Sequence, residues 1–265
     1  MTIPLPADSS DDLRLAVDAA LTAGAIIHER FHAQPSQVQR KDGKGEVTET
    51  DLAAEAAIFD VLAASDHGVL SEEAGGETKG DLWIVDPVDG TTNFSRRLSL
   101  CAVSIGLRLG DELSLGVIYH PVTGDLFFAE RGLGAWRNQQ RLHVAATADP
   151  SLAVIYLTHG YAAEHRQRYG QALARFAKTS YPRTLGSTAV ELSFVAAGSG
   201  DAWICSGDEL WDFAAGMVLV EEAGGRVSDW HGDGWDGQST YTIVSNGAIH
   251  DFLTDTVGDL QPSNQ

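Results

Sequence analysis

The sequence predicts an α+β protein in which helices and sheets form layers. Three patterns indicate this class: apolar residues at helical spacing near the N-terminus, consecutive strand patterns in the middle, and alternating strands and helices after residue 150. The hydrophobic share of 43% among 265 residues is enough for a sizeable core, and the length fits one large domain or two small ones. The sequence contains no low-complexity segment and no repeat period of about 20 to 50 residues, which excludes a solenoid.

Two helices are expected first. Apolar or small residues recur at steps of three and four from Asp11 to Phe31, and Ser9 or Ser10 can cap the start of this helix. The polar, glycine-rich stretch QRKDGKGEV that follows predicts a loop. Thr50 is expected to cap the second helix, with Asp51 in its first turn. The apolar positions of that helix are Leu52, Ala56, Phe59 and Leu62.

Strands dominate the middle of the chain, and the second half alternates. The apolar run 82–85 ends at Asp86 and Pro87, which predicts a buried strand that stops abruptly in a turn. Further strands, expected to form an antiparallel sheet, lie at 101–109, 113–119 and 126–129. After a polar joint near 148–151, strands are expected at 153–158, 201–205 and 241–245, and helices at 164–178, 188–197 and 212–223.

The composition excludes several classes of partner. The chain has 37 Asp plus Glu against 18 Lys plus Arg, a formal net charge of −19, which opposes binding to nucleic acid and to anionic membranes. Cys101 and Cys205 form neither a disulfide framework nor a Cys-x-x-Cys zinc motif, which favours a reducing compartment. No signal-peptide pattern and no uninterrupted apolar run of about 18 residues is present. We therefore expect a soluble cytoplasmic protein without nucleic-acid or membrane partners.

The segment DLWIVDPVDGTTNF, residues 81–94, is the most informative part of the sequence. Asp86 and Asp89 flank a proline at the end of the predicted strand, and two carboxylates across a rigid turn can bracket a hard cation such as Mg²⁺. If Gly90 and Thr91 open a helix, their backbone N–H groups would meet a phosphate. The Pro-x-Asp-Gly pattern is by itself equally compatible with an ordinary turn.

Other carboxylates are ordinary when each is taken alone. Glu72 and Glu73 are adjacent and precede two glycines, so their charges repel unless a cation or solvent is near. Asp51 and Asp212 fall at the starts of predicted helices, where a carboxylate interacts favourably with the helix dipole.

Four ordered motifs, however, together resemble those of the inositol monophosphatase family, the Mg²⁺-dependent, lithium-sensitive phosphomonoesterases. They are VTETDLAAE, LSEEAGG, WIVDPVDGTTNF and WDFAAGMVLVEEAGG, and they span residues 47–225. The resemblance implies a layered αβαβα sandwich that forms one phosphatase domain over residues 1–265. Residues 1–147 would form an α+β half with most metal ligands, and residues 148–265 an α/β half. It also implies a homodimer.

The resemblance further implies a centre that holds two or three Mg²⁺ ions. Its ligands would be Glu72, Asp86, the backbone carbonyl of Val88, Asp89 and Asp212, with Asp51 at a further, weaker site. The implied catalytic set is Glu72, Thr91 and Asp51, with the Thr91 hydroxyl beside the attacking water. The implied substrate-facing residues are Asp89, Gly90, Thr91, Arg183, Gly186, Ser187, Thr188 and Asp212. Either Lys41 or Lys44 would be the lysine of the family's mobile loop.

The implied reaction is hydrolysis of a phosphomonoester by an activated water, without a covalent phosphoenzyme. A myo-inositol phosphate is the first expected substrate, because the GTTNF ending resembles inositol monophosphatases more than nucleotide bisphosphatases. Histidinol phosphate and fructose bisphosphate are the alternatives. A noncatalytic regulatory or binding module on the same scaffold is an alternative of another class. It predicts the loss of at least one metal carboxylate, and none is lost.

Cys205 separates this chain from the inositol-specific pattern. It stands where members that act on inositol phosphate carry a glutamate that binds sugar hydroxyls, and a thiol is a poor replacement for a carboxylate. Asp208 or Glu209 is a candidate for the same role. The simpler interpretation of Cys205 itself is a small apolar side chain at the end of a buried strand.

Overall fold

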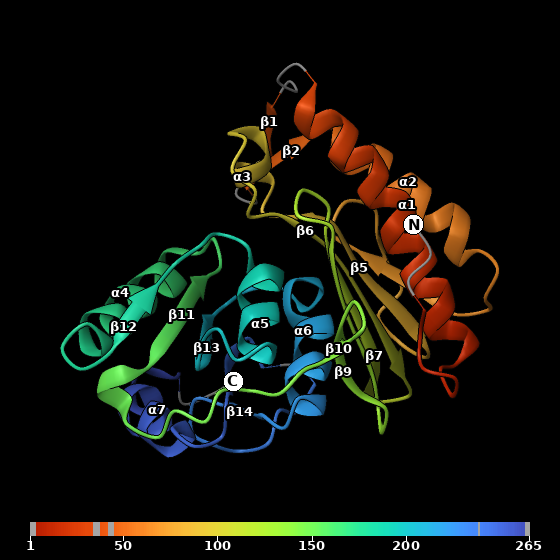
Figure 1. The fold of residues 1–265 in the computed structure, drawn as a ribbon. Coiled ribbons are helices and arrows are strands. Elements are labelled where there is room, and N and C mark those ends of the chain that lie inside the picture. The colour runs from red at the N-terminus through yellow and green to blue at the C-terminus, as the bar shows by residue number, and fades with distance from the viewer. Residues whose placement is uncertain (1–3, 34–37, 42–44, 238, 263–265) are drawn as a thin grey trace.

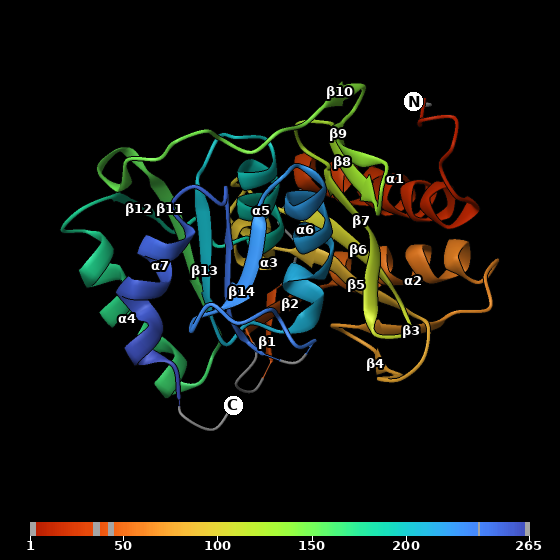
Figure 2. The same ribbon diagram turned by 90° about the horizontal axis from the view of Figure 1, so that it is seen from below.

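Helices and sheets alternate in five layers in the computed structural model, which describes residues 4–33, 38–41, 45–237 and 239–262 (Figure 1). Figure 2 shows the layers side by side. Helices α1 (Asp11–His32) and α2 (Glu49–Leu62) pack on one face of an eight-stranded sheet, and α5 (Thr188–Ala196) and α6 (Leu210–Glu222) pack between it and a five-stranded sheet. Helices α4 (Ala163–Phe176) and α7 (His250–Val257) pack against the second sheet on its other side. The predicted αβαβα layering is confirmed.

The larger sheet has the strand order β10-β9-β8-β7-β6-β5-β3-β4. Its strands are β3 (Gly68–Ser71), β4 (Gly75–Gly76), β5 (Leu82–Asp89), β6 (Ala102–Leu109), β7 (Glu112–His120), β8 (Asp125–Glu130), β9 (Gly134–Arg137) and β10 (Gln140–Arg141). Neighbouring strands are antiparallel, except that β3 and β5 are parallel. All eight residues of β5 are buried, because helices cover both faces of the sheet at this strand.

The smaller sheet has the order β12-β11-β13-β15-β14. Its strands are β11 (Val154–His159), β12 (Tyr181–Arg183), β13 (Ala202–Ser206), β14 (Arg226–Asp229) and β15 (Tyr241–Ser245). Strand β11 is parallel to both of its neighbours, whereas β15 is antiparallel to β13 and β14. The carboxyl ends of β11 and β13 therefore lie at the same edge of this sheet. The remaining elements are β1 (Val38–Lys41), β2 (Gly45–Thr48), α3 (Thr91–Ser95), η1 (Pro150–Leu152) and η2 (Gly258–Leu260).

Helix α6 is the central element of the middle layer. Every residue from Phe213 to Val220 is buried, as expected of a helix that is apolar all round and enclosed by two sheets. Strand β7 approaches it closely at Gly116, where an added Cβ would lie 2.2 Å from the Ala215 carbonyl oxygen. This contact fixes the position of α6, and with it the carboxylate in its first turn.

Most predicted elements are confirmed to within two residues at each end, but three details of the N-terminal half are wrong. The loop expected after α1 contains a β-hairpin, in which β1 and β2 pair antiparallel with Val38 opposite Thr48. Thr48, not Thr50, caps α2. Leu52 is 55% exposed and Ala56 is exposed as well, because the helix turns polar residues such as Asp51 inward. Apolar spacing alone could not reveal a helix face that buries carboxylates.

The strand predicted at 82–85 also runs further than expected. Strand β5 continues through Pro87 to Asp89, and its register against β6 shifts between Asp86 and Asp89. A proline has no N–H for a ladder hydrogen bond and is tolerated where such an irregularity interrupts the pairing.

The two sheets lie on either side of the predicted boundary at residue 147. Strands of the larger sheet end at Arg141, and those of the smaller begin at Val154. Division into two sub-domains stays a prediction. None of the helices that the structure describes is both long enough and apolar enough to span a membrane.

Candidate active site

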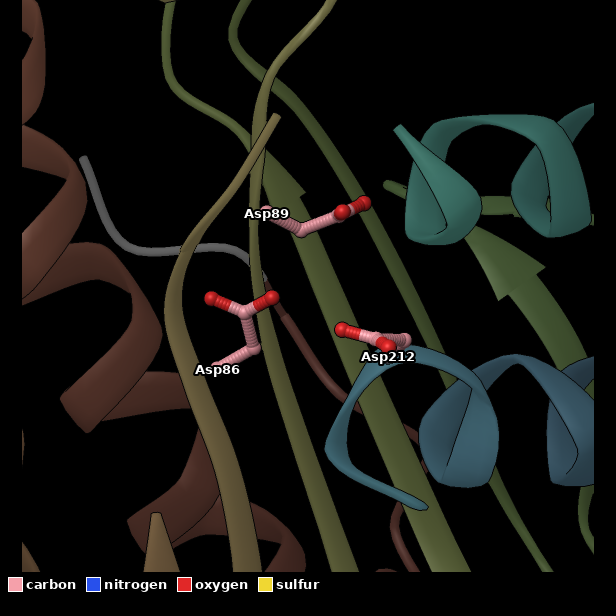
Figure 3. A group of neighbouring side chains, drawn as sticks. All are labelled: Asp86, Asp89 and Asp212. Atoms are coloured by element: carbon pink, nitrogen blue, oxygen red, sulfur yellow. The ribbon is translucent and has the colours of Figure 1, made fainter. Parts of the chain in front are cut away.

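Three carboxylates from distant parts of the chain converge between the two sheets. Asp86 and Asp89 come from the end of β5, and Asp212 comes from the first turn of α6 (Figure 3). One carboxylate oxygen of each lies within 4.8 Å of the others. These residues, which we call the aspartate triad, could together hold a metal ion.

The irregularity in β5 explains how one strand supplies two members of the triad. In a regular strand, side chains three residues apart point to opposite faces of the sheet. The register shift between Asp86 and Asp89 alters this alternation, and Figure 3 shows both carboxylates directed toward the same space. The turn is held locally, because the Val88 backbone N–H donates to Asp86 Oδ1 at 3.0 Å.

Asp89 is anchored by the start of α5. The Ser187 hydroxyl and the Ala189 backbone N–H both donate to Asp89 Oδ2, each at 2.6 Å. Ser187 is also the N-cap of α5. The Asn93 side-chain amide donates to the carbonyl oxygens of Leu185 at 2.8 Å and Gly186 at 3.2 Å, which holds the preceding loop in place. The second half of the chain thus fixes a carboxylate of the first half.

Asp212 is held within its own helix. It is residue N3 of a capping box, and its Oδ2 accepts the backbone N–H of Glu209 at 2.8 Å. The interaction with the helix start, expected from the sequence, therefore coexists with a place in the aspartate triad.

Burial and the charges of neighbouring carboxylates raise the pKa of every member of the triad, and the charge of Asp208 contributes at Asp89 and Asp212. Burial is the main cause in each case, and it raises the pKa of Asp89 to about 7. The charge of Glu72, which also lines the cavity, raises all three pKa values further. None of the cavity-lining residues in the described part of the chain is a lysine or arginine. Crowded carboxylates without a basic partner are a donor set that suits a hard divalent cation.

Asp51 and Thr91 form a buried pair beside the triad. The Thr91 hydroxyl lies 2.8 Å from Asp51 Oδ1 and 3.0 Å from the Val88 carbonyl oxygen. The other carboxylate oxygen of Asp51 accepts the backbone N–H and the hydroxyl of Thr48, at 2.9 and 2.5 Å. Thr91 lines the cavity, whereas Asp51 is fully buried behind it. Asp51 is therefore placed to act on the cavity through the Thr91 hydroxyl.

A cavity of about 480 Å³ opens at the triad and receives residues from both halves of the chain. The residues that the sequence predicted for the site and that line this cavity are Glu72, Asp86, Val88, Asp89, Gly90, Thr91, Gly186, Ser187, Thr188 and Asp212. Gly90 is the N-cap of α3, as the sequence suggested, and has φ +85°. An added Cβ there would lie 2.7 Å from the Leu100 carbonyl oxygen, so glycine is required at this point of the wall.

Besides Asp51, which is buried behind Thr91, three further predicted residues are not placed in the cavity. Arg183 is exposed on β12, where its guanidinium donates to the Pro182 carbonyl oxygen at 2.9 Å, and its neighbour Thr184 lines the cavity instead. Lys44 lies outside the described residues, and only the backbone of Lys41 is described. The roles assigned to all three stay predictions.

Sequence reasoning missed most of the wall that the second half contributes. This wall follows the ends of β11 and β13 and includes Thr158, His159, Gly160, Tyr161, His165, Gly207 and Trp211. From the first half, Glu46 and Thr92 were also missed. A usable signal was present, since each strand ends in a short polar stretch with a glycine, and the ends of parallel neighbours meet at one sheet edge.

Cys205 does not take part in this wall. Its side chain is fully buried at the end of β13 and packs in the main hydrophobic core. The interpretation of Cys205 as a buried strand end is confirmed. Asp208 and Glu209, the two alternatives named from the sequence, both line the cavity.

Comparison with known proteins agrees with this architecture. The sequence model of the inositol monophosphatase family matches residues 8–261. The inositol-1-monophosphatase of Synechocystis is 36% identical over 257 residues, which cover 94% of this chain and 89% of that protein. The Nus factor SuhB of Salmonella typhimurium is 37% identical over 228 residues, covering 83% and 85%. The crystal structure of the extragenic suppressor protein suhB from Bartonella henselae superposes with a TM-score of 0.87 at 33% identity, covering 94% and 98%.

The fold, the carboxylate-lined cavity and these similarities define a metal-dependent phosphatase. More specifically, the chain belongs to the inositol monophosphatase family, as the match over nearly its whole length shows.

Proposed function

We propose that this protein is a Mg²⁺-dependent phosphomonoesterase that converts a myo-inositol monophosphate and water to inositol and phosphate. The observation that carries the proposal is the aspartate triad, whose buried like charges need a cation and open onto a cavity large enough for a small phosphate ester. Relatives named inositol-1-monophosphatase support the choice of substrate.

The metal-holding residues in this proposal are the triad, Glu72 and the Val88 carbonyl, with Asp51 at a further, weaker site. Carboxylate and carbonyl oxygens are the ligands that Mg²⁺ takes in proteins, and two or three ions would balance the clustered charge. When bound there, Mg²⁺ would supply Lewis acidity toward the attacking water and the departing ester oxygen.

Thr91 and Glu72 orient the attacking water in this mechanism. Because the Thr91 hydroxyl donates to Asp51, its oxygen keeps a lone pair that can accept a hydrogen bond from the water. Glu72 lines the same cavity and can accept the second hydrogen bond. Two acceptors fix the water's orientation, so that its own lone pair is aimed at phosphorus. Asp51 acts by holding Thr91 in this state.

The phosphate and the alcohol are held by different segments. We assign the phosphate side to Asp89, Asp212 and the backbone at Gly90 and Thr91, where α3 begins. The alcohol side is assigned to the start of α5, with Gly186, Ser187 and Thr188 in the cavity wall.

Side-by-side phosphate-release assays test the proposal. Purified protein is given inositol 1-phosphate, histidinol phosphate and fructose 1,6-bisphosphate, each with Mg²⁺, with EDTA, and with Mg²⁺ plus Li⁺. We expect the highest kcat/KM for inositol 1-phosphate, no turnover in EDTA and inhibition by Li⁺. Activity that is unaffected by EDTA would refute the metal assignment. A clear preference for histidinol phosphate would refute the substrate assignment.

We also propose that the protein works as a homodimer in a reducing compartment such as the cytoplasm. Similarity to the family supports the dimer, and two free, buried cysteines are compatible with a reducing environment. A solution mass near the 28.3 kDa of one chain would contradict the dimer.

A further inference from the structure

The cavity wall opposite β5 is built around two glycines that touch. An added Cβ on Gly160, just after β11, would lie 2.0 Å from the Gly207 carbonyl oxygen. Gly207, just after β13, has φ +92°, and a Cβ there would lie 2.0 Å from His165 Nδ1. Both positions therefore require glycine, and the close contact fixes the path of the chain into Asp208.

Asp208 is held in this wall by hydrogen bonds to two neighbours, Thr188 and Cys205. Its side chain is 8% exposed and lines the cavity. The Thr188 hydroxyl donates to its Oδ2 at 2.8 Å. Its backbone N–H donates to Cys205 Sγ at 3.2 Å, and this thiol in turn donates to the Thr240 carbonyl oxygen at 3.3 Å. Cys205 thus supports the turn that presents the carboxylate.

The start of α5 also connects Asp208 to Asp89 of the aspartate triad. Three consecutive residues at the start of α5 make the connection: Ser187 and Ala189 bind Asp89, and Thr188 between them binds Asp208. A phosphate group held at the triad would leave its alcohol portion in the remainder of the cavity, where Asp208 forms part of the wall.

The polar atoms of this wall are suited to an alcohol that carries hydrogen-bond donors. Asp208 and Glu209 offer carboxylate oxygens, which accept hydrogen bonds. His165 Nδ1 is buried and has no hydrogen-bond partner among the described residues. A buried polar atom without a partner costs free energy, which a ligand hydroxyl can recover.

From these contacts we infer that Asp208 is the specificity-determining residue of the site, the acceptor for hydroxyl or ammonium donors on the substrate's alcohol portion. The inference rests on the proposed phosphatase function and assigns its substrate class: monophosphates of polyols or amino alcohols, in preference to esters of alcohols without such donors. The resemblance to the family places this acceptor at position 205, but the side chain of Cys205 packs in the hydrophobic core.

Asp208→Asn tests the inference with little change of shape. The amide oxygen of Asn can still accept the Thr188 hydrogen bond, while the charged acceptor is lost. We expect kcat/KM for inositol 1-phosphate to fall about tenfold or more, mainly through a higher KM, because hydrogen bonds to charged groups are the strong ones. With 4-nitrophenyl phosphate, whose alcohol portion has no hydroxyl group, we expect a change below about threefold.

Asp201→Asn is the matched control. Asp201 is 5% exposed and precedes the other end of β13, where its carboxylate accepts the Val154 N–H at 2.8 Å, outside the cavity. This variant should lower the melting temperature without changing the ratio of the two kcat/KM values. The inference on Asp208 is wrong if Asp208→Asn leaves that ratio unchanged, whether both activities persist or both fall. Absence of Mg²⁺-dependent turnover in the wild-type protein would instead refute the proposed function.

Discussion

The two walls of the cavity are both acidic, but they hold their carboxylates differently. At the end of β5, Asp86 and Asp89 are buried close to Asp212, and burial together with the charges of nearby carboxylates raises their pKa values. On the opposite wall, Asp208 is paired with a threonine hydroxyl, and Glu209 is exposed. The difference teaches that acidity alone does not define a metal centre. Carboxylates on both walls accept hydrogen bonds, and burial raises the pKa of Asp208 as well. The triad differs because its three carboxylates lie close enough together to share one cation.

Among the substitutions that test this difference between the walls, Asp89→Asn should cause the largest loss of activity. The substitution removes a charge from the triad but keeps an oxygen that can accept the Ser187 and Ala189 hydrogen bonds. We expect Mg²⁺-dependent turnover to fall by more than the roughly 100-fold that residues around metal ligands typically contribute. Phosphate release measures the activity, and circular dichroism checks that the fold is intact. Activity near the wild-type level would exclude Asp89 from the metal centre.

Substitutions at Thr91, which is hydrogen-bonded to Asp51, test the orientation of the attacking water separately from the binding of the metal. Thr91→Ala removes the hydroxyl that lies 2.8 Å from Asp51 Oδ1, and we expect kcat to fall about 100-fold with little change in KM. Thr91→Ser, which keeps the hydroxyl, should recover most of the rate. If serine and alanine are equally impaired in steady-state assays, the threonine methyl group is what matters and the proposed role of the hydroxyl is wrong.

Ser187 connects the start of α5 to Asp89, and its substitution should have a smaller effect on activity than that of Thr91. Ser187→Ala removes a hydrogen bond to Asp89 and the N-cap of α5, so the Mg²⁺ concentration for half-maximal activity should rise about tenfold.

Ser10→Ala provides the matched control, because Ser10 caps α1 through a 3.0 Å bond from the Leu13 N–H. Both variants should lose about 1 kcal/mol of stability from the missing cap, but only Ser187→Ala should change the Mg²⁺ requirement. An equal Mg²⁺ requirement in the two variants would mean that Ser187 is merely a helix cap.

The smallest expected effect is on stability as a function of pH. The pKa of Asp89 rises from 3.8 to about 7 on burial, so the folded, metal-free protein keeps a proton that the unfolded chain has released. The resulting stabilisation is fully present below pH 3.8 and is lost as the pH rises through 7. Buried His120 and His250, with pKa values lowered from 6.5 to about 4, have the opposite effect, but only below pH 6.5.

The informative window therefore lies above pH 6.5. Between there and about pH 8, thermal melts in EDTA should show Tm falling by roughly 2–4 °C or more. Saturating Mg²⁺ should abolish the fall, and Asp89→Asn should reduce it. A Tm in EDTA that is constant or rises across this window would contradict the raised pKa.

The residues themselves pointed to a metal site at Asp86 and Asp89, whereas Asp212 was assigned only through the resemblance to the family. Much of the opposite wall was missed, apart from the start of α5 and the candidates Asp208 and Glu209, and the physical reason is locality. Asp86, Asp89 and Gly90 lie in one short segment whose strand, bulge and helix start are set by neighbouring residues, so a motif can represent them. Asp208 lies in the connection after β13 and His165 in the first turn of α4, and the two meet because β11 and β13 pair in parallel. The cap of α2 was misassigned for a similar reason, because Thr48 belongs to a hairpin strand that its polar sequence did not reveal.

The central claim is that Asp86, Asp89 and Asp212 hold the catalytic metal. The most direct test is a crystal structure of the protein with Mn²⁺ in place of Mg²⁺, using the anomalous scattering of manganese to locate the ions. We predict anomalous peaks between the three carboxylates, at the roughly 2 Å distances typical of oxygen ligands. Saturating Mn²⁺ that supports activity but gives no peak among these carboxylates would contradict the claim.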